Sequence, residues 1–387
     1  DGERWRRVAD WYASIEPRLI DSLLGTFPAV RPVARLGPQH LARLTRIFLS
    51  SERALAERWF TSGAARRVLP GLALHADVGP DDRFGAAVGF MLGMTATTGG
   101  YAVPQGGAKS LANALVQCLG AYGGTLRLAA RVTRVIVRNR RAAAVRLSSG
   151  EEIAARVVLA DTDVGALLLD LLDRGNVPSW VASFMHRYPR GWGTFKVDWA
   201  LQSSVPWSVG PASESAVVHA GDSIEDLRRF TLQVRSGALP EHPYLVIGQQ
   251  SLVDTTRAPP GRHTLWAYTH VPSKLDRGWA EAEEKFGDRI DARIESLAPG
   301  FRSRILARRV VSPDRLQAMN PNLVGGDLGG GSSAWHRQLL FRPMFPYFRY
   351  RMPVNGLYLC SSYAHPGAGV HGMCGYNAAK QVLTDLT

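Results

Sequence analysis

The 387-residue sequence predicts an α/β protein with two domains. Its length exceeds the roughly 250–300 residues at which a single hydrophobic core stops growing, which favours two domains. Apolar residues recur at helical spacing near the N-terminus, as in Tyr12, Ile15 and Leu19. Farther along, the continuous apolar run 157–160 ends at Asp161, which is typical of a strand buried on both faces of a parallel sheet. A composition of 45% hydrophobic and 20% charged residues excludes a disordered chain.

The N-terminal and central segments predict helices followed by a small sheet. Residues 1–98 are expected to be helical, with Pro17 kinking or breaking the first helix. A helix over 108–122 is expected to end at Gly123-Gly124, because glycine readily adopts the left-handed conformation that terminates helices. Short alternating or β-branched runs then predict strands, of which the last three form an antiparallel meander: 125–128, 132–138, 142–147 and 152–156.

The remaining sequence predicts a second, mostly antiparallel sheet and a closing strand–loop–helix unit. Phe195, Val197 and Trp199 alternate with polar or small residues, which is the pattern of a strand with one buried face. Further strands are expected at 244–248, 263–271 and 357–360, a helix at 280–297, and a final helix from about residue 372 to the end.

The net charge of +13 does not by itself indicate a nucleic-acid partner. Only five of the 46 basic residues are lysines, and the arginines are dispersed without long runs, which favours the compositional bias of GC-rich coding sequences. Three cysteines without CxxC spacing indicate neither a disulfide framework nor a zinc site, and we expect no bound metal. No apolar run is long enough to predict a transmembrane helix. We therefore expect a cytoplasmic protein that contacts a membrane at most peripherally.

The segment 356–379 carries the most chemical information. It predicts a buried strand, a loop containing Gly367 and Gly369, and a helix that begins near His371 or Gly372. Backbone without side chains can approach a flat ligand closely, and a helix N-terminus offers free N–H groups to an electron-rich edge. A tight turn followed by a closely packed helix explains the same residues, and physical reasoning alone weighs the two interpretations about equally.

Four stretches of the chain, taken together and in order, resemble the phytoene-desaturase-like family of FAD-dependent oxidoreductases, which includes carotenoid desaturases and isomerases: 104–115, 123–135, 157–163 and 356–379. The resemblance implies an FAD/NAD(P)-binding domain of the glutathione-reductase-like Rossmann type, interleaved with a mixed α+β substrate domain that contains an antiparallel sheet. It assigns 100–164 and 332–387 to the FAD-binding domain, and 1–99 and 165–331 to the substrate domain.

The resemblance also implies where FAD binds. Val132 would contact the adenine half through its backbone, and the loop 361–370 would pass along the ribityl-diphosphate and the flavin. The helix that begins at His371-Gly372-Met373 would direct its N–H groups at the N1/O2 edge of the flavin, where reduction places negative charge. The contacts implied within the loop are Ser361, Ser362, Gly367, Gly369 and Val370.

Two departures from the family pattern bear on FAD binding. The family's Gly-Asp pair after the final strand is Ser361-Ser362 here, so a hydroxyl replaces the carboxylate that holds the ribityl or diphosphate region. The GxGxxG fingerprint that grips the pyrophosphate does not occur in these 387 residues. We therefore expect that the family's first βαβ unit is missing and that this chain alone binds FAD poorly or not at all.

The resemblance implies FAD-dependent oxidation of an apolar substrate of polyene or isoprenoid type. No catalytic base is predicted; His365, His371 and Tyr363 are candidates, although backbone hydrogen bonding is the commoner role of loop histidines and packing explains the tyrosine equally well. Residues 320–331 are expected to form either a mobile loop over the active site or an exposed connector. The alternatives are an amine-oxidase-like flavoenzyme and a non-catalytic lipid- or prenyl-binding protein on the same scaffold. The oligomeric state is not predicted.

Overall fold

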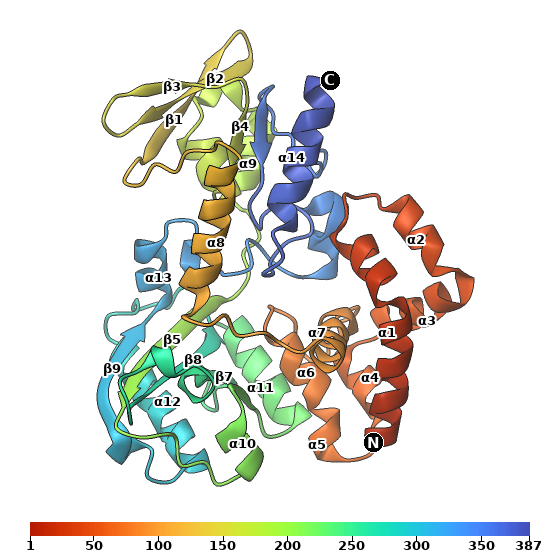
Figure 1. Cartoon of the computed structure of the whole chain (residues 1–387), viewed down its shortest axis with the longest axis vertical. Coiled ribbons are helices and arrows are strands. Elements are labelled where there is room, and N and C mark those ends of the chain that lie inside the picture. Colours follow the sequence, from red (N-terminus) through yellow and green to blue (C-terminus); the bar gives the residue numbers. More distant parts are fainter.

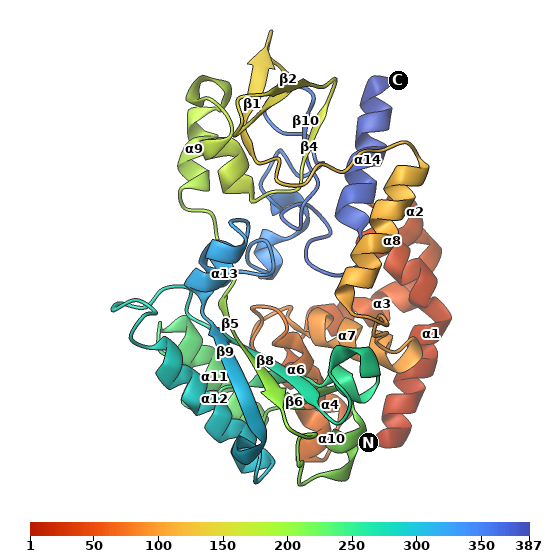
Figure 2. The same ribbon diagram turned by 60° about the vertical axis from the view of Figure 1, so that its left-hand side comes forward.

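The computed structural model describes all 387 residues and arranges them in two lobes (Figure 1). The upper lobe in that view holds the two small sheets and the C-terminal helix. The lower lobe holds the N-terminal helices and the large antiparallel sheet. Helix α8, Ala108–Ala121, runs between the lobes in both views (Figure 2). Residues between 165 and 188, at the start of the segment expected as substrate domain, pack in one core with residues 344–378 of the upper lobe.

The N-terminal region is helical, as predicted. Its helices are α1 (Gly2–Leu24), α2 (Val30–Leu36), α3 (Pro38–Phe48), α4 (Glu52–Trp59), α5 (Gly63–Arg66), α6 (Val68–Ala73) and α7 (Ala86–Thr98). Pro17 lies inside α1, which continues to Leu24, so the proline does not break the helix. Tyr12 and Phe90 are fully buried where α1 packs against α7. A Cβ at Gly89 would lie 2.3 Å from Glu52 Oε1, so this glycine allows α7 to approach α4.

Helix α8 is followed by the predicted meander. The strands are β1 (Val132–Arg138), β2 (Arg141–Leu147) and β3 (Glu152–Ala154), paired antiparallel in the order β1-β2-β3. The strand predicted at 125–128 is wrong, because this segment has no partner strand and leaves Leu126 and Leu128 exposed. Every residue of α8 is exposed as well.

The predicted parallel strand is present but is covered on one face only. Strand β4 (Val158–Ala160) pairs in parallel with β10 (Leu357–Leu359), and these form a sheet of two strands. The expectation that β4 is buried on both faces is wrong, since Leu159 is 39% exposed.

The large sheet has the order β6-β7-β8-β5-β9 and is antiparallel. Its strands are β5 (Gly193–Leu201), β6 (Val217–Ala220), β7 (Leu245–Gly248), β8 (His263–Val271) and β9 (Ile305–Val311). As predicted, Phe195, Val197 and Trp199 are buried, and they pack in one core with Phe286 and Ile290 of helix α12 (Glu283–Leu297). The opposite face carries polar and aromatic side chains and is turned toward the N-terminal helices.

The remaining helices are α9 (Ser179–Met185), α10 (Gly210–Glu214), α11 (Ile224–Arg235), α13 (Pro313–Met319) and α14 (Met373–Leu386). Short 3₁₀ turns and one π-helical turn at 166–170 complete the chain. None of the helices combines the length and the apolar character that crossing a membrane requires.

Candidate functional site

The loop between β10 and α14, residues 360–372, is anchored at its first turn. The buried Ser361 donates its hydroxyl proton to the Thr162 carbonyl at 2.8 Å, next to the end of β4. The Ser362 carbonyl accepts hydrogen bonds from Arg342 Nε and Nη2 at 3.1 and 2.8 Å. Both serines expected to contact the cofactor therefore fix the loop to its neighbours, Ser361 through its side chain and Ser362 through its backbone.

The middle of the loop has the open backbone that its glycines predict. Gly367 and Gly369 have φ angles of 103° and 146°, which favour glycine. A Cβ at Gly367 would lie 2.8 Å from Arg342 Nε, so the missing side chain allows the guanidinium to approach the loop. Val370 is 95% exposed, which leaves this part of the loop open.

Helix α14 begins directly after the loop and is capped by His371. Gly372 is left-handed, with φ of 65°, and the Met373 N–H donates to His371 Nδ1 at 3.0 Å. Burial lowers the pKa of His371, which keeps the ring neutral and able to accept this bond. One N–H group expected to face a cofactor is thus satisfied within the chain, and a residue expected as an acid–base candidate makes a helix-capping contact.

His365 makes its contact with the N-terminal helices, and Val132 lies in the meander. His365 Nε2 donates to the Gly25 carbonyl at 3.0 Å, and burial lowers the pKa of its ring. This bond ties the loop to the N-terminal helices, which is the backbone role that the sequence left open. Val132 pairs with Leu147 in the meander, and no hydrogen bond joins it to the loop. The structure therefore brings residues 361–373 together, but not Val132.

A buried ion pair lies beside the loop. Asp163, 2% exposed, pairs with Arg190 and accepts a hydrogen bond from the Ala166 N–H at 2.7 Å. Arg190 Nη1 also donates to Tyr363 Oη at 2.6 Å, and the Tyr363 hydroxyl donates to the Asn322 carbonyl at 3.1 Å. Burial raises the pKa of Tyr363, so the hydroxyl keeps its proton. Burial is the largest single influence and works to lower the pKa of Arg190, but the bond to Asp163 together with the nearby Tyr363 and Asp327 outweighs it, so the pKa of the guanidinium is raised.

The glycine-rich segment 325–331 is held in place by one carboxylate. Asp327, 2% exposed, accepts hydrogen bonds from the N–H groups of Gly191, Gly329 and Gly331 at 2.9, 2.7 and 2.8 Å. The buried Arg342 donates to the Gly329 carbonyl at 2.6 Å and so joins this segment to the loop 360–372. The expectation of an exposed connector is therefore wrong for these residues.

Sequence reasoning missed four residues of this site, namely Arg190, Asn322, Asp327 and Arg342. Arg190, Asn322 and Arg342 contact segments remote in sequence, which neither periodicity nor local spacing reveals, whereas Asp327 bonds mainly to the nearby Gly329 and Gly331. The available signal was an acidic residue among glycines at 325–331, where a carboxylate can accept from several exposed N–H groups.

A cavity of about 890 Å³ opens beside the ion pair. Its apolar wall includes Leu23, Phe48, Val78, Phe84, Trp192, Trp335 and Leu339. The carboxylates at its edge have partners: Asp82 pairs with Arg235 at 2.5 Å, and Asp77 accepts from the Ser332 hydroxyl at 2.5 Å. Arg190 lines the cavity and also bonds to Tyr363. The cavity and the loop 360–372 therefore meet at Arg190.

Several proteins are similar in sequence to this chain over part of their length. A "Pyridine nucleotide-disulfide oxidoreductase domain-containing protein 2" of Mus musculus is 30% identical over 304 residues, which cover 75% of this chain and 52% of that protein. A "Phytoene desaturase (neurosporene-forming)" of Rhodobacter capsulatus is 28% identical over 287 residues, covering 71% of this chain and 51% of that protein. The chain thus spans about half the length of these curated relatives.

Solved structures share the fold. An oxidoreductase from Methanosarcina mazei has a TM-score of 0.60 at 15% identity, covering 91% of this chain and 71% of that one. Wild-type putrescine oxidase bound to putrescine has a TM-score of 0.55 at 16% identity, covering 100% of this chain and 77% of that one. The family model described as "Flavin containing amine oxidoreductase" matches residues 18–383. On this match, which spans nearly the whole chain, the protein belongs to the flavin-containing amine oxidoreductase family.

Proposed function

We propose that this chain supplies the substrate cavity and the flavin end of the cofactor site in an FAD-dependent oxidoreductase that oxidises an apolar substrate. The observation that carries the proposal is the cavity of about 890 Å³, which meets the loop 360–372 at Arg190. A mostly apolar pocket with a few placed polar groups is typical of small-molecule sites. When bound, FAD supplies the two-electron acceptor for oxidation of a C–H bond.

The residues present fit the flavin end of FAD. A Cβ at Gly372 would meet nothing within 4 Å, so the backbone there is open to a flat ring, whereas Arg342 lies beside Gly367 and His371 lies beside Gly369. The start of α14 and the buried Arg342 place positive potential at this loop. We propose that these groups hold the flavin and favour negative charge on its N1/O2 edge.

We further propose that the diphosphate is held by a GxGxxG-containing unit that packs against α8 and β4. Leu111, Leu115 and Leu119 recur at intervals of one helical turn along α8, and they are 44%, 64% and 44% exposed. Leu159 of β4 adds a fourth uncovered apolar side chain. An apolar surface of this kind is typical of a face that another element covers. Flavin absorbance of the purified chain tests this proposal, because stoichiometric FAD in the chain alone would contradict it.

The cavity favours an apolar substrate over an amine. The carboxylates at its edge are already engaged: Asp82 is paired with Arg235, and Asp77 accepts hydrogen bonds from the Ser332 hydroxyl and the Ser333 N–H. Of the arginines that line the cavity, Arg190 and Arg235 are paired with Asp163 and Asp82, whereas Arg83 has no carboxylate partner and would disfavour a cationic amine. We therefore propose a polyene or isoprenoid-like substrate, in keeping with the relatives named phytoene desaturases.

Anaerobic mixing tests the substrate class. The FAD-loaded protein is mixed with an acyclic polyene or with putrescine. We expect the flavin absorbance to bleach with the polyene alone. Bleaching with putrescine alone would support the amine-oxidase alternative. A protein that binds a prenylated lipid tightly but is not reduced by any donor would support the non-catalytic alternative.

A matched pair of variants tests the cavity itself. Phe84→Asp places a charge in the apolar wall and is expected to weaken polyene binding strongly. Leu232→Asp changes an exposed residue of α11 outside the cavity and is expected to have no effect. Equal binding by the two variants would show that the polyene binds elsewhere.

We also propose peripheral contact with an anionic membrane at the mouth of this cavity. Leu49, Trp335 and Leu339 line the cavity and are nevertheless 58%, 58% and 45% exposed, so they form an apolar rim. Arg83 lines the same cavity. Apolar side chains beside a cation suit an anionic lipid surface. Co-sedimentation with anionic but not with neutral vesicles is expected, and Trp335→Ser should weaken it.

A further inference from the structure

The polar face of the large sheet carries a row of side chains that the site described so far does not use. His219 of β6 lies opposite Val246 of β7, and Val246 lies opposite Tyr268 of β8. Residues in register point to the same face of a sheet, and His270 lies two residues beyond Tyr268 on that face. The strands therefore place His219, Tyr268 and His270 together under the N-terminal helices.

His75, from the turn that follows α6, completes a hydrogen-bonded chain across this face. Its Nε2 lies 2.7 Å from His219 Nε2, and its Nδ1 lies 2.7 Å from Tyr268 Oη. A neutral imidazole donates from one nitrogen while it accepts at the other. The hydrogen bonds of this row can therefore point in either of two directions. The donors face from Tyr268 toward His219 in one arrangement and from His219 toward Tyr268 in the other.

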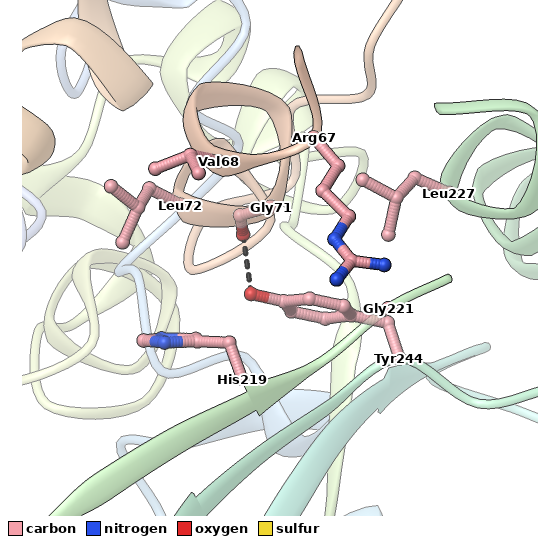
Figure 3. Close-up of a pocket in the computed structure, with 8 residues that line it drawn as sticks. All are labelled: Arg67, Val68, Gly71, Leu72, His219, Gly221, Leu227 and Tyr244. Atoms are coloured by element: carbon pink, nitrogen blue, oxygen red, sulfur yellow. Dashed lines mark hydrogen bonds between the residues drawn. The ribbon is translucent and has the colours of Figure 1, made fainter. Parts of the chain in front are cut away.

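The outer end of the chain opens into a small cavity of about 200 Å³ (Figure 3). The His219 and Tyr244 rings project into it from the strands, and Arg67 reaches it from the start of α6 (Figure 3). The Tyr244 hydroxyl is engaged, because it donates to the Gly71 carbonyl at 2.5 Å. Of the three hydrogen-bonded side chains, His219 is therefore the one that can exchange a proton with water in this cavity.

Buried polar atoms without hydrogen-bond partners lie between Tyr268, at the inner end of the hydrogen-bonded chain, and Trp192, which lines the large cavity. His270 is 6% exposed, and neither of its ring nitrogens has a hydrogen-bond partner. The hydroxyl of Thr194, its neighbour across strands β5 and β8, is buried and unpartnered as well. The His270 ring lies 5.7 Å from that of Trp192, which lines the large cavity. Buried polar atoms of this kind are ordinarily satisfied by ordered water.

We propose that His219, His75 and Tyr268, together with water held by His270 and Thr194, conduct a proton between the large cavity and the small outer cavity. This inference rests on the proposed function. When a substrate becomes a C=C product, one C–H bond gives up a hydride to the acceptor, and the adjacent C–H bond leaves its electron pair in the new double bond. The proton from that second bond has to leave an apolar cavity, and the chain gives it a route to water.

The charge state of the histidines suits this role. Burial lowers the pKa of His75 to about 4 and desolvation also lowers the pKa of His219, whose side chain is exposed at the outer cavity, so both rings are neutral at neutral pH. The His219 ring and the His270 ring lower the pKa of His75 further. A neutral ring relays a proton by accepting it at one nitrogen and releasing another from the second, and no lasting charge remains in the interior.

Nitrogen-15 NMR of the histidine rings tests the proton relay of His219, His75 and Tyr268 without any cofactor. A shared, mobile proton gives both facing Nε2 atoms shifts between those of protonated and bare imidazole nitrogen, and Tyr268→Phe is expected to freeze them into one protonated and one bare nitrogen. His242→Gln, at an exposed histidine outside the network, is the control and should change neither. A wild-type spectrum with one fully protonated and one bare Nε2 would mean a static structural bond and would overturn the relay.

Thr194→Val tests the water at the inner end. If the hydroxyl holds water, the variant lowers the Tm and slows exchange of the His75 ring proton with solvent. If the hydroxyl is truly unpartnered, valine removes a buried unsatisfied group and the Tm rises, which would overturn the water link.

The FAD-loaded protein supplies the functional arm. His219→Ala is expected to slow reduction of the flavin by substrate on the order of a hundredfold, with recovery on adding imidazole, which fits the outer cavity. Slow reduction without recovery would overturn the relay. If no substrate reduces the flavin of the wild-type protein but the NMR spectra show the shared proton, the proposed function is wrong while the hydrogen-bonded network is confirmed.

Discussion

The charge state of Glu52 leads to a sharp prediction about stability and pH. Glu52, at the start of α4, is 0% exposed; its Oε1 accepts the Gly89 N–H at 2.8 Å, and its Oε2 has no partner. Burial raises the pKa of this carboxyl well above its ordinary value, and the Gly89 bond offsets only part of the effect. The folded protein therefore holds a proton that the unfolded chain releases near pH 4–5.

The sign and the size of the effect follow from proton linkage. A raised pKa in the folded state gives stability that is full below the pKa of the unfolded chain and is lost as pH rises toward the folded pKa. The loss is about 1.4 kcal/mol per pH unit in that window, hence roughly 2.7 kcal/mol between pH 5 and pH 7 if Glu52 stays protonated. Glu52→Gln keeps the shape and removes the proton exchange.

Denaturant unfolding from pH 5 to pH 8 measures this difference. As pH rises, we expect the free energy of unfolding of Glu52→Gln to increase relative to that of the wild type by about 1.4 kcal/mol per pH unit. Only the wild type has to keep a proton that its unfolded chain releases. Glu57→Gln, at a half-exposed position of the same helix, is the control and should parallel wild type. Equal pH slopes for wild type and Glu52→Gln would refute the reasoning.

Three further predictions follow from the packing. Gly89→Ala places a Cβ 2.3 Å from Glu52 Oε1 and 2.3 Å from the Leu69 carbonyl, so we expect a loss of at least about 3 kcal/mol and a lower Tm by circular dichroism. Arg190→Met leaves the buried carboxylate of Asp163 unpaired and should cost about 3–5 kcal/mol in denaturant unfolding, whereas the double variant with Asp163→Asn should recover part of it. Leu115→Glu, at an exposed site of α8, should change the unfolding free energy of this chain by less than about 0.5 kcal/mol but weaken FAD binding once a GxGxxG-containing unit is present; an unchanged affinity for FAD would argue against packing on α8.

Local pattern predicted much of the fold because local pattern determines which face of an element is buried. The alternation around Phe195 gave the central strand β5 and its buried face, and the Gly-Gly pair after residue 122 correctly placed the end of α8. The segment 125–128 failed for the opposite reason: its alternation is that of a strand, but no partner strand lies beside it. Burial of Leu159 was overestimated because burial on the second face depends on what covers the sheet, which a run of apolar residues does not encode.

The site was predictable in its loop and not in its supporting contacts. The glycines at 367 and 369 have the positive φ angles expected for open backbone, and these follow from residue type alone. The contact between Arg190 and Tyr363 joins residues 173 positions apart, so it exists only once the chain has folded. His371 can accept the Met373 N–H only because α14 begins at Met373, and the sequence does not predict the first residue of a helix that accurately.

Helix α8 is connected to each lobe at its ends while no residue along it is buried. Its backbone hydrogen bonds can therefore open without disturbing any hydrophobic core, and amide hydrogen exchange along Ala108–Ala121 should be faster than in α1 or α12. A partner that binds α8 also suppresses its local opening, so the free energy of binding at α8 is coupled to the free energy of helix formation there. The lobes are also joined by contacts that do not involve α8, such as the bond from His365 to the Gly25 carbonyl, so a partner on α8 can stabilise this helix without changing how the lobes are held together.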